Sequence, residues 1–429
     1  MSNIAAPKPI EAQLTDALRT LLGAALLTLL LVTFTPFQTQ FQGDLDSGNL
    51  VNQLGYSALG ALALAGHLFF TERRVALSLL RPFWIVTVLW LLFAAVQSLY
   101  PPNALRALAF TLFAMLAATG ALCLPPHARA FRFALAAASL AVLGLSYAGV
   151  VLIPEVAVHS AADLESQHAG LWRGIYSHKN TAGAIMATLF FCGLYLLRAG
   201  NRLSGAAIMV LSGLFVLQAG SKTAAALLPL VAALVLSPRL TGSRHLPVLV
   251  LSAALAGLAL ATLGSVLIPA MDALVQWVLP GTTFTGRTDI WRFSFEQLAP
   301  RQWTGFGFES FWRTPAMLAM EASRELSWDP RFTPNAHNGY LDIAIAAGWP
   351  GLALVVGTLI VLPFRDFVRT PQDAASRRLA DLFLMILSFA LMNSFLETFL
   401  FDRANPFWVM MWFSVAGLRL LARHRPLPN

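Results

Sequence analysis

Repeated apolar stretches, each about 15 to 23 residues long, constrain the fold of this chain more than any other feature. A transmembrane helix needs about 20 predominantly apolar residues. Only 12% of the 429 residues are charged, whereas a soluble domain carries about 25%. The chain is therefore predicted to be an all-α polytopic membrane protein, with residues 1–429 forming a single integral membrane domain. About 12 transmembrane helices are expected, over residues 20–37, 52–70, 82–99, 105–124, 132–153, 180–198, 205–220, 223–237, 246–269, 339–363, 381–399 and 405–421.

The basic residues are unevenly divided between the two sides of these spans. If the N-terminus is cytoplasmic, the cytoplasmic segments hold 18 of the 29 basic residues but 6 of the 21 acidic ones. Cytoplasmic loops carry an excess of Lys and Arg, so both termini are expected in the cytoplasm. Because the basic residues are dispersed as topology signals, nucleic acid is not an expected partner despite the net charge of +8.

Two loops on the outer side are long enough to hold structure of their own, over residues 154–179 and 270–338. The larger lies between the ninth and tenth spans. Its segments 288–298 and 316–326 have aromatic and aliphatic faces, which predict short amphipathic helices on the bundle or at the lipid interface. No internal repeat relates the two halves of the chain, which argues against a transporter.

The sequence "GIYSHKNTAG" places His178, Lys179 and Asn180 at the outer end of the sixth span. Free backbone N–H groups and the positive end of the helix dipole make such a terminus suitable for an anion. Two other interpretations stay open: Lys179 can extend its charge to the membrane interface, and Asn180 can cap the helix.

The sequence "LQAGSKTAAALL" places Lys222 in a tight turn or break between two spans. A lysine near membrane depth is costly unless it has a partner or an aqueous cavity. Lys222 is therefore either a cation positioned for a phosphate or a residue that reaches the interface.

The large outer loop contains "FTGRTDIWRFSFEQLAP" followed by "WTGFGFESFW". Arg287 and Arg292 suit bidentate phosphate contacts. Gly305 and Gly307 allow a turn that brings the backbone close to a ligand. The alternative is an ordinary loop with surface salt bridges, such as one between Arg287 and Asp289.

The loop ends with "NAHNGYLDIAIAAGWPG", in which His337 and Asn338 precede the tenth span. Histidine is the usual general base near neutral pH, although a lone histidine can be purely structural. No HExxH, paired CxxC, P-loop or GxSxG motif occurs. Neither a metal nor a cofactor is therefore expected, and ATP hydrolysis or serine esterase chemistry is disfavoured.

In this order, the four motifs resemble those of the O-antigen ligase and polymerase superfamily of bacterial envelope enzymes. The likeness covers Gly174 to Gly351. The "SHKN" wording is most similar to exopolysaccharide polymerases of the Wzy and ExoQ kind, including the xanthan-type polymerase. Where many relatives have arginine in a "GSR" sequence, this chain has Lys222.

This resemblance implies a GT-C-like membrane glycosyltransferase that works without metal or cofactor in the bacterial inner membrane. Donor and acceptor would be undecaprenyl-diphosphate-linked oligosaccharides, polymerised into exopolysaccharide on the periplasmic side by inverting transfer. Membrane lipid and a chain-length co-polymerase are the further partners it suggests. The alternatives are an O-antigen ligase that transfers glycan to lipid A-core and a polysaccharide transporter or flippase.

The resemblance also suggests roles for the residues of the four motifs. His337 would be the base, and Arg287 and Lys222 would stabilise the departing diphosphate. The expected substrate-binding residues are Lys179, Asn180, His178, Arg292, Asn338 and Gly307.

Overall fold

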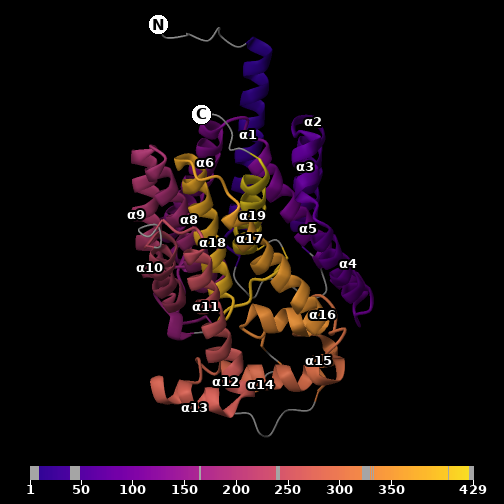
Figure 1. The fold of residues 1–429 in the computed structure, drawn as a ribbon. Helices are drawn as coiled ribbons and strands as arrows, with labels where there is room; N and C mark the ends of the chain where they lie inside the picture. Colours follow the sequence, from indigo (N-terminus) through magenta and orange to yellow (C-terminus); the bar gives the residue numbers. More distant parts are fainter. Residues whose placement is uncertain are drawn as a thin grey trace.

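The computed structural model describes residues 9–38, 49–163, 166–237, 242–320, 329, 331, 333–403 and 405–424. The long helices run side by side as a bundle (Figure 1). The start of α1 (Ile10–Val32) and the end of α19 (Pro406–Arg423) lie at one end of this bundle. At the opposite end lie α13 (Pro269–Val278), α14 (Arg287–Leu298) and α15 (Pro315–Leu318).

Each of the twelve predicted stretches contains helix in the structure. In addition to α1 and α19, the helices of the bundle are α2 (Leu50–Phe70), α3 (Arg73–Leu79), α4 (Pro82–Val96), α5 (Pro101–Cys123), α6 (Ala128–Leu152), α8 (Lys179–Arg198), α9 (Arg202–Ala219), α10 (Lys222–Leu236), α11 (Leu246–Ala259), α12 (Ser265–Leu267), α16 (Gly339–Val356), α17 (Leu362–Val368) and α18 (Ala374–Asn393). A four-residue helix, α7 (Pro154–Ala157), follows α6.

Eight of the described helices are long and apolar enough to cross a membrane, or nine if α3 and α4, bent by 55°, form one span. This confirms an all-α polytopic membrane protein. The figure of 12 spans stays a prediction, because three of the predicted spans fail the same test. Among these, α10 has only 15 residues, and α18 carries Arg377, Arg378 and Asp381.

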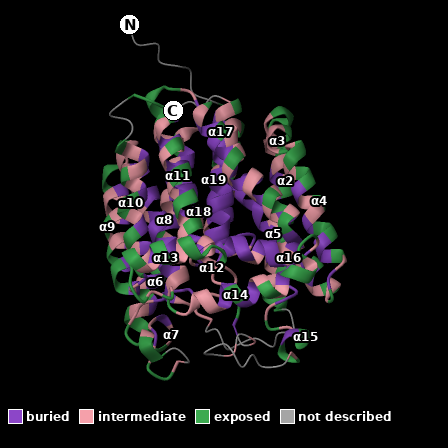
Figure 2. Ribbon diagram, turned by 60° about the horizontal axis from the view of Figure 1, so that its bottom comes forward, coloured by how far each residue is buried: buried purple, intermediate pink, exposed green. Residues whose placement is uncertain are grey.

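The centre of the bundle is formed by α18 and α19. Most of their residues are buried, 15 of the 20 in α18 and 14 of the 18 in α19, and this burial is coloured purple in Figure 2. Because neighbouring helices shield them from the surroundings, polar groups can be retained there if they are paired. Asp381 on α18 is fully buried and lies 2.8 Å from the Arg198 guanidinium at the end of α8.

The chain is broken within α16 at Gly348, whose φ of +69° and ψ of 179° are not helical. Pro350 follows two residues later and has no N–H to donate. The carbonyl groups of residues 345–347 therefore lose their normal helical donors. They accept instead from the backbone N–H groups of Phe306 and Gly307 and from the Trp90 indole, at 2.8 to 3.0 Å.

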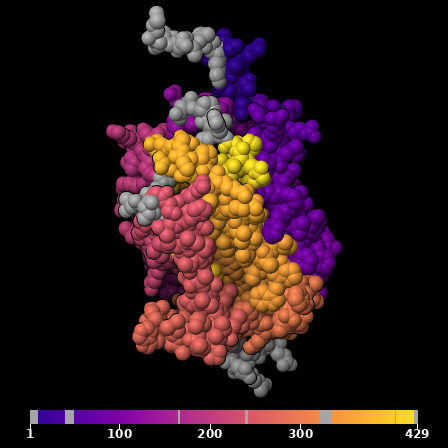
Figure 3. All heavy atoms as spheres, in the orientation of Figure 1, coloured from indigo at the N-terminus to yellow at the C-terminus, as the bar shows by residue number. Residues whose placement is uncertain are grey.

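The outer loop forms a layer across its end of the molecule, coloured salmon to orange in Figure 3. The helix predicted over residues 288–298 is present as α14. Of the helix predicted over 316–326, the structure has only α15, and residues 321–326 lie outside the described part of the chain. The eleventh helix is displaced from its predicted bounds of 381–399, since α18 ends at Asn393.

We expect Gly348→Ala to lower the melting temperature of the purified protein. A Cβ there would lie 2.5 Å from the backbone carbonyl carbon of Trp303, and the left-handed φ is itself strained by about 1–3 kcal/mol for other residues. The matched control is Gly257→Ala in α11, where nothing lies within 4 Å of the added Cβ. Equal melting temperatures for the two variants would contradict this account of the break.

Candidate functional site

One carboxylate, that of Glu397, joins three segments that are far apart in the sequence. It lies in the connection between α18 and α19. Its Oε1 accepts hydrogen bonds from the Asn180 amide at 2.7 Å and from the Arg287 guanidinium at 2.8 Å. Its Oε2 lies 3.5 Å from Nδ1 of His337. We call these four residues the Glu397 cluster.

The surroundings of Glu397 keep its carboxylate ionised. Burial alone would raise its pKa, but the contact with His337 and the positive charge of Arg287 outweigh burial and lower the pKa below the ordinary value. The cluster therefore holds a fixed negative charge opposite the imidazole and the guanidinium.

The backbone of His337 is in the left-handed region, with φ of +48°. For a residue other than glycine this conformation costs about 1–3 kcal/mol and is most often found at functional sites. It is supported by a hydrogen bond from the His337 N–H to the Asn335 side chain, at 2.9 Å. The next residue, Asn338, caps α16 through the N–H groups of Tyr340 and Leu341.

The imidazole of His337 presents one buried and one accessible edge. Nδ1 is buried and makes no hydrogen bond that meets normal criteria, while 31% of the side chain is exposed. The exposed part of the side chain therefore does not include Nδ1. A carboxylate facing Nδ1 favours the tautomer with its proton on that atom, which leaves Nε2 able to accept a proton.

The N-terminus of α8 is capped by His178, whose Nδ1 accepts from the Asn180 N–H at 3.1 Å. The expectation that Asn180 could be the cap is therefore wrong, and its side chain reaches Glu397 instead. Lys179 is buried, and its Nζ donates to the carbonyl of Gly220 at 3.3 Å. This bond joins α8 to the turn between α9 and α10, so Lys179 is turned towards the protein rather than an open anion site.

Three imidazoles pack edge to face beside this helix end, those of His159, His168 and His178, with ring centroids 5.4 to 5.7 Å apart. Nε2 of His159 accepts from the Lys179 N–H, so its proton lies on Nδ1, 3.0 Å from Asp163. Burial lowers the pKa of His159 to about 4. Among the described residues, no three His, Cys, Asp or Glu side chains are grouped to hold a metal ion.

Two predicted cations lie apart from the Glu397 cluster. Lys222 is exposed at the first residue of α10, and no hydrogen bond or ion pair to the cluster is found among the described residues. Arg292 is 53% exposed and lies 3.4 Å from Asp289. The surface salt bridge expected for Arg287 is therefore made by Arg292, which the structure does not place in a phosphate site.

Two further predicted residues have structural roles here. Asn338 is fully buried, and its amide group donates to the Phe395 carbonyl at 3.0 Å while its oxygen caps α16. Both of these contacts are with backbone groups, and a contact with substrate stays a prediction. Gly307 donates to a carbonyl at the break in α16, and an added Cβ would lie 2.0 Å from Ser98. Its close approach is to the end of α4 and the residues after it, and Gly307 also lines the cavity of about 600 Å³ described below.

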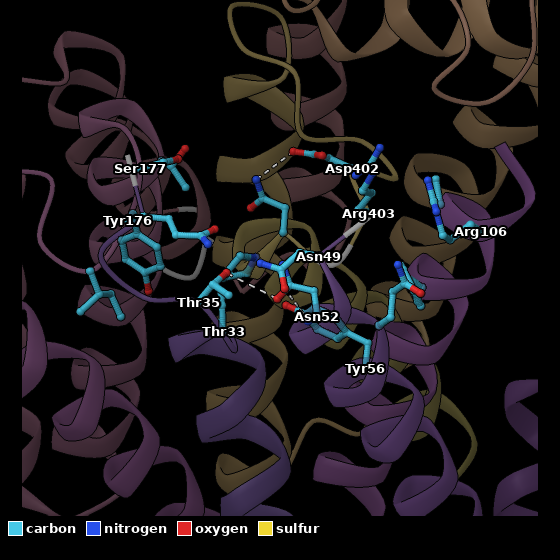
Figure 4. Close-up of a pocket in the computed structure, with 18 residues that line it drawn as sticks. Thr33, Thr35, Asn49, Asn52, Tyr56, Arg106, Tyr176, Ser177, Asp402 and Arg403 are labelled. Carbon is cyan, nitrogen blue, oxygen red and sulfur yellow. Dashed lines mark hydrogen bonds between the residues drawn. The ribbon is translucent and has the colours of Figure 1, made fainter. Parts of the chain in front are cut away.

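A polar cavity of about 340 Å³ lies near the N-terminus of α8, between α1, α2, α5 and the connection before α19 (Figure 4). Its wall includes Ser177 and Thr181, which flank the α8 residues already described. The other polar side chains that line it are Thr33, Thr35, Gln38, Asn49, Asn52, Gln53, Tyr56, Arg106, Tyr176, Asp402, Arg403 and Asn405. Amide and hydroxyl groups of this density can hydrogen-bond a ligand rich in hydroxyls.

A second cavity of about 600 Å³ shares Asn49, Asn52, Arg106, Asp402 and Arg403 with the first. It continues under the outer loop and adds side chains from residues 307–315 and from the start of α16. The two cavities therefore extend the polar region from the N-terminus of α8 towards the outer loop.

Sequence reasoning missed both Glu397 and these cavities. The predicted span 381–399 placed Glu397 inside an apolar helix. An unpaired acid is costly there, and this cost is the feature of the sequence that could have identified Glu397 as a residue with a partner. The cavity residues come from many separate segments, and each is an ordinary polar residue in its own local sequence.

Comparison with known proteins is consistent with the motifs quoted above. A family model described as O-antigen ligase matches residues 187–356, from α8 to the end of α16. The comparison with curated proteins gave no match. The matched region includes Lys222, Arg287 and His337, whereas Asn180 and Glu397 lie outside it.

The titration of Asp402 gives a testable pH dependence. Burial and the negative charge of Glu309 raise the pKa of Asp402 from 3.8 to about 7. The neutral form of Asp402 therefore stabilises the folded protein. This contribution to the free energy of unfolding is fully present below pH 3.8 and is lost as the pH rises through about 7. We expect the melting temperature of Asp402→Asn to increase relative to wild type between about pH 5 and 8. A difference that does not change over this range would contradict the raised pKa.

Proposed function

We propose that this chain is a member of the O-antigen ligase and polymerase superfamily that polymerises lipid-linked oligosaccharides. The match of residues 187–356 to the O-antigen ligase family model supports this proposal. The donor and acceptor are repeat units on undecaprenyl diphosphate, and the reaction is a metal-independent, inverting glycosyl transfer. The observation that carries this proposal is the Glu397 cluster, which combines a histidine, an orienting carboxylate and a guanidinium, with a polar cavity near the N-terminus of α8.

In the proposed reaction, Nε2 of His337 takes the proton from a sugar hydroxyl of the acceptor. The hydroxyl oxygen forms a bond to the anomeric carbon of the donor sugar. At the same time the bond between that carbon and the diphosphate oxygen breaks, and the diphosphate leaves with the electron pair. Attack from the opposite face inverts the anomeric configuration.

Arg287 is the residue best placed to stabilise the departing diphosphate. Only one of its N–H groups is used by Glu397, and a guanidinium has five. Lys222, exposed at the start of α10, contributes a positive field that attracts the diphosphate. The polar cavities hold the glycan, because their amide, hydroxyl and aromatic side chains suit sugar hydroxyls and ring faces.

We place the cluster on the periplasmic side of the bacterial inner membrane and both termini in the cytoplasm. The division of basic residues supports this orientation. Thr304 and Ala374 lie on either side of the helical segment from α16 to α17. Reporter fusions should therefore be periplasmic at Thr304 and cytoplasmic at Ala374. Finding both on one side of the membrane would exclude this topology.

The decisive experiment measures polymer formation by purified protein from lipid-linked donor and acceptor. We expect His337→Ala to lose at least about 100-fold in rate, because the proton acceptor is removed. Arg287→Ala should lose about 30- to 1000-fold through weaker stabilisation of the diphosphate. The matched variant Arg292→Ala removes an exposed arginine of the same helix and should lose far less.

Protein abundance and melting temperature are measured for each variant, so that loss of fold is separated from loss of turnover. Glu397→Gln adds a test of the orienting role, since the amide can still accept from Asn180 but no longer carries the charge. A His337→Ala protein that is folded and fully active would remove the base from the mechanism. Equal losses in Arg287→Ala and Arg292→Ala would remove the special role of Arg287.

The second candidate function is that of an O-antigen ligase, which the description of the matching family favours. The acceptor separates the two functions. In a deletion strain, single repeat units left on the lipid carrier indicate a polymerase. Full-length chains on the carrier together with bare lipid A-core indicate a ligase.

A further inference from the structure

A cavity of about 780 Å³ lies at the end of the bundle opposite the Glu397 cluster. It is surrounded by the start of α6 and α18 and by the end of α2, α5, α8 and α19. Three arginines line it, Arg19 on α1, Arg132 on α6 and Arg378 on α18. Its apolar wall includes Phe70, Leu122, Phe131, Leu379, Phe383 and Leu420.

The positive charge of this cavity is only partly balanced by the residues that line it. Glu72 is the one acid among the residues that line it. No ion pair joins Arg19, Arg132 or Arg378 to a carboxylate within the described ranges, and Nε of Arg132 is buried without a hydrogen-bond partner. Arg19 has its Nε bonded to a backbone carbonyl, that of Leu124, at 3.0 Å.

Other arginines at the same end of the bundle differ in this respect. Arg81 lies 2.5 Å from the buried carboxylate of Asp366, and Arg198 lies 2.8 Å from that of Asp381. Partly buried cations without a counter-charge are costly, so a cavity with three of them favours an anionic ligand. The guanidinium group is particularly suited to phosphate oxygens.

The depth of the arginines identifies the kind of phosphate. Arg132 and Arg378 each lie about one turn inside the helix that carries them, α6 and α18. A position near a helix end corresponds to the headgroup level of a bilayer, where basic pockets between helices bind anionic lipid headgroups. The apolar wall beside the arginines suits a hydrocarbon chain and gives no benefit to a free phosphate ion.

We propose that this cavity binds the phosphate group of an anionic phospholipid, with Arg132 and Arg378 as its main contacts. Arg19 completes the positive rim, and the acyl chain lies along the apolar wall. This site is separate from the proposed glycosyl transfer and does not depend on it.

The test uses the full-length protein, purified in neutral detergent, with lipid binding measured by native mass spectrometry. The probes are phosphatidic acid, phosphatidylcholine with the same acyl chains, and inorganic phosphate. We expect phosphatidic acid to bind at least about tenfold more tightly than phosphatidylcholine, and inorganic phosphate not to compete. Arg132→Gln and Arg378→Gln should each weaken binding of phosphatidic acid by about tenfold or more.

The matched control is Arg129→Gln, which removes an exposed arginine from the same helix without touching the cavity. It should bind phosphatidic acid like wild type. Arg132→Lys keeps the charge and should retain more binding than Arg132→Gln, which separates loss of contact from loss of fold. Equal binding of the two lipids, equal effects of Arg129→Gln and Arg132→Gln, or full competition by inorganic phosphate would each overturn the proposal.

Discussion

The carboxylate of Glu397 is the interaction on which the arrangement of the outer end depends. Without it, the largely buried Arg287 guanidinium would lose the counter-charge that lies 2.8 Å from it. Removing one partner of a buried charge pair typically costs about 3–5 kcal/mol, because the other charge is left uncompensated. One side chain thus holds together Asn180 near the start of α8, Arg287 at the start of α14 and His337 two residues before α16.

The same principle organises the interior. The central helices α18 and α19 are shielded by the more apolar helices around them, so they can contain arginine and aspartate where lipid-facing helices cannot. The connection between these two central helices can hold a buried acid, because residues from several segments can contact it there. It brings Glu397 to the middle of the bundle end, within reach of segments on opposite sides.

Hydropathy was sufficient to predict an all-helical membrane protein with helix in each predicted stretch, because burial in lipid acts on each segment by itself. The motifs also identified His337, Arg287 and Asn180, three of the four residues of the cluster. Glu397 and the polar cavities depend on hydrogen bonds between distant segments, which no local pattern reports. For Gly307, the sequence correctly predicted a close approach of the backbone. The neighbours in the structure are the end of α4 and the broken helix.

The break in α16 has a consequence for how a substrate reaches the site. The backbone of the outer loop supplies donors to carbonyl groups that the broken helix leaves open. Each such carbonyl, left unpaired away from water, costs several kcal/mol. Residues 305–307 therefore cannot swing out as a hinged cover, and this part of the loop acts as a fixed wall. Under the proposed function, a lipid-linked substrate would therefore reach the site by a route that needs no movement of this segment.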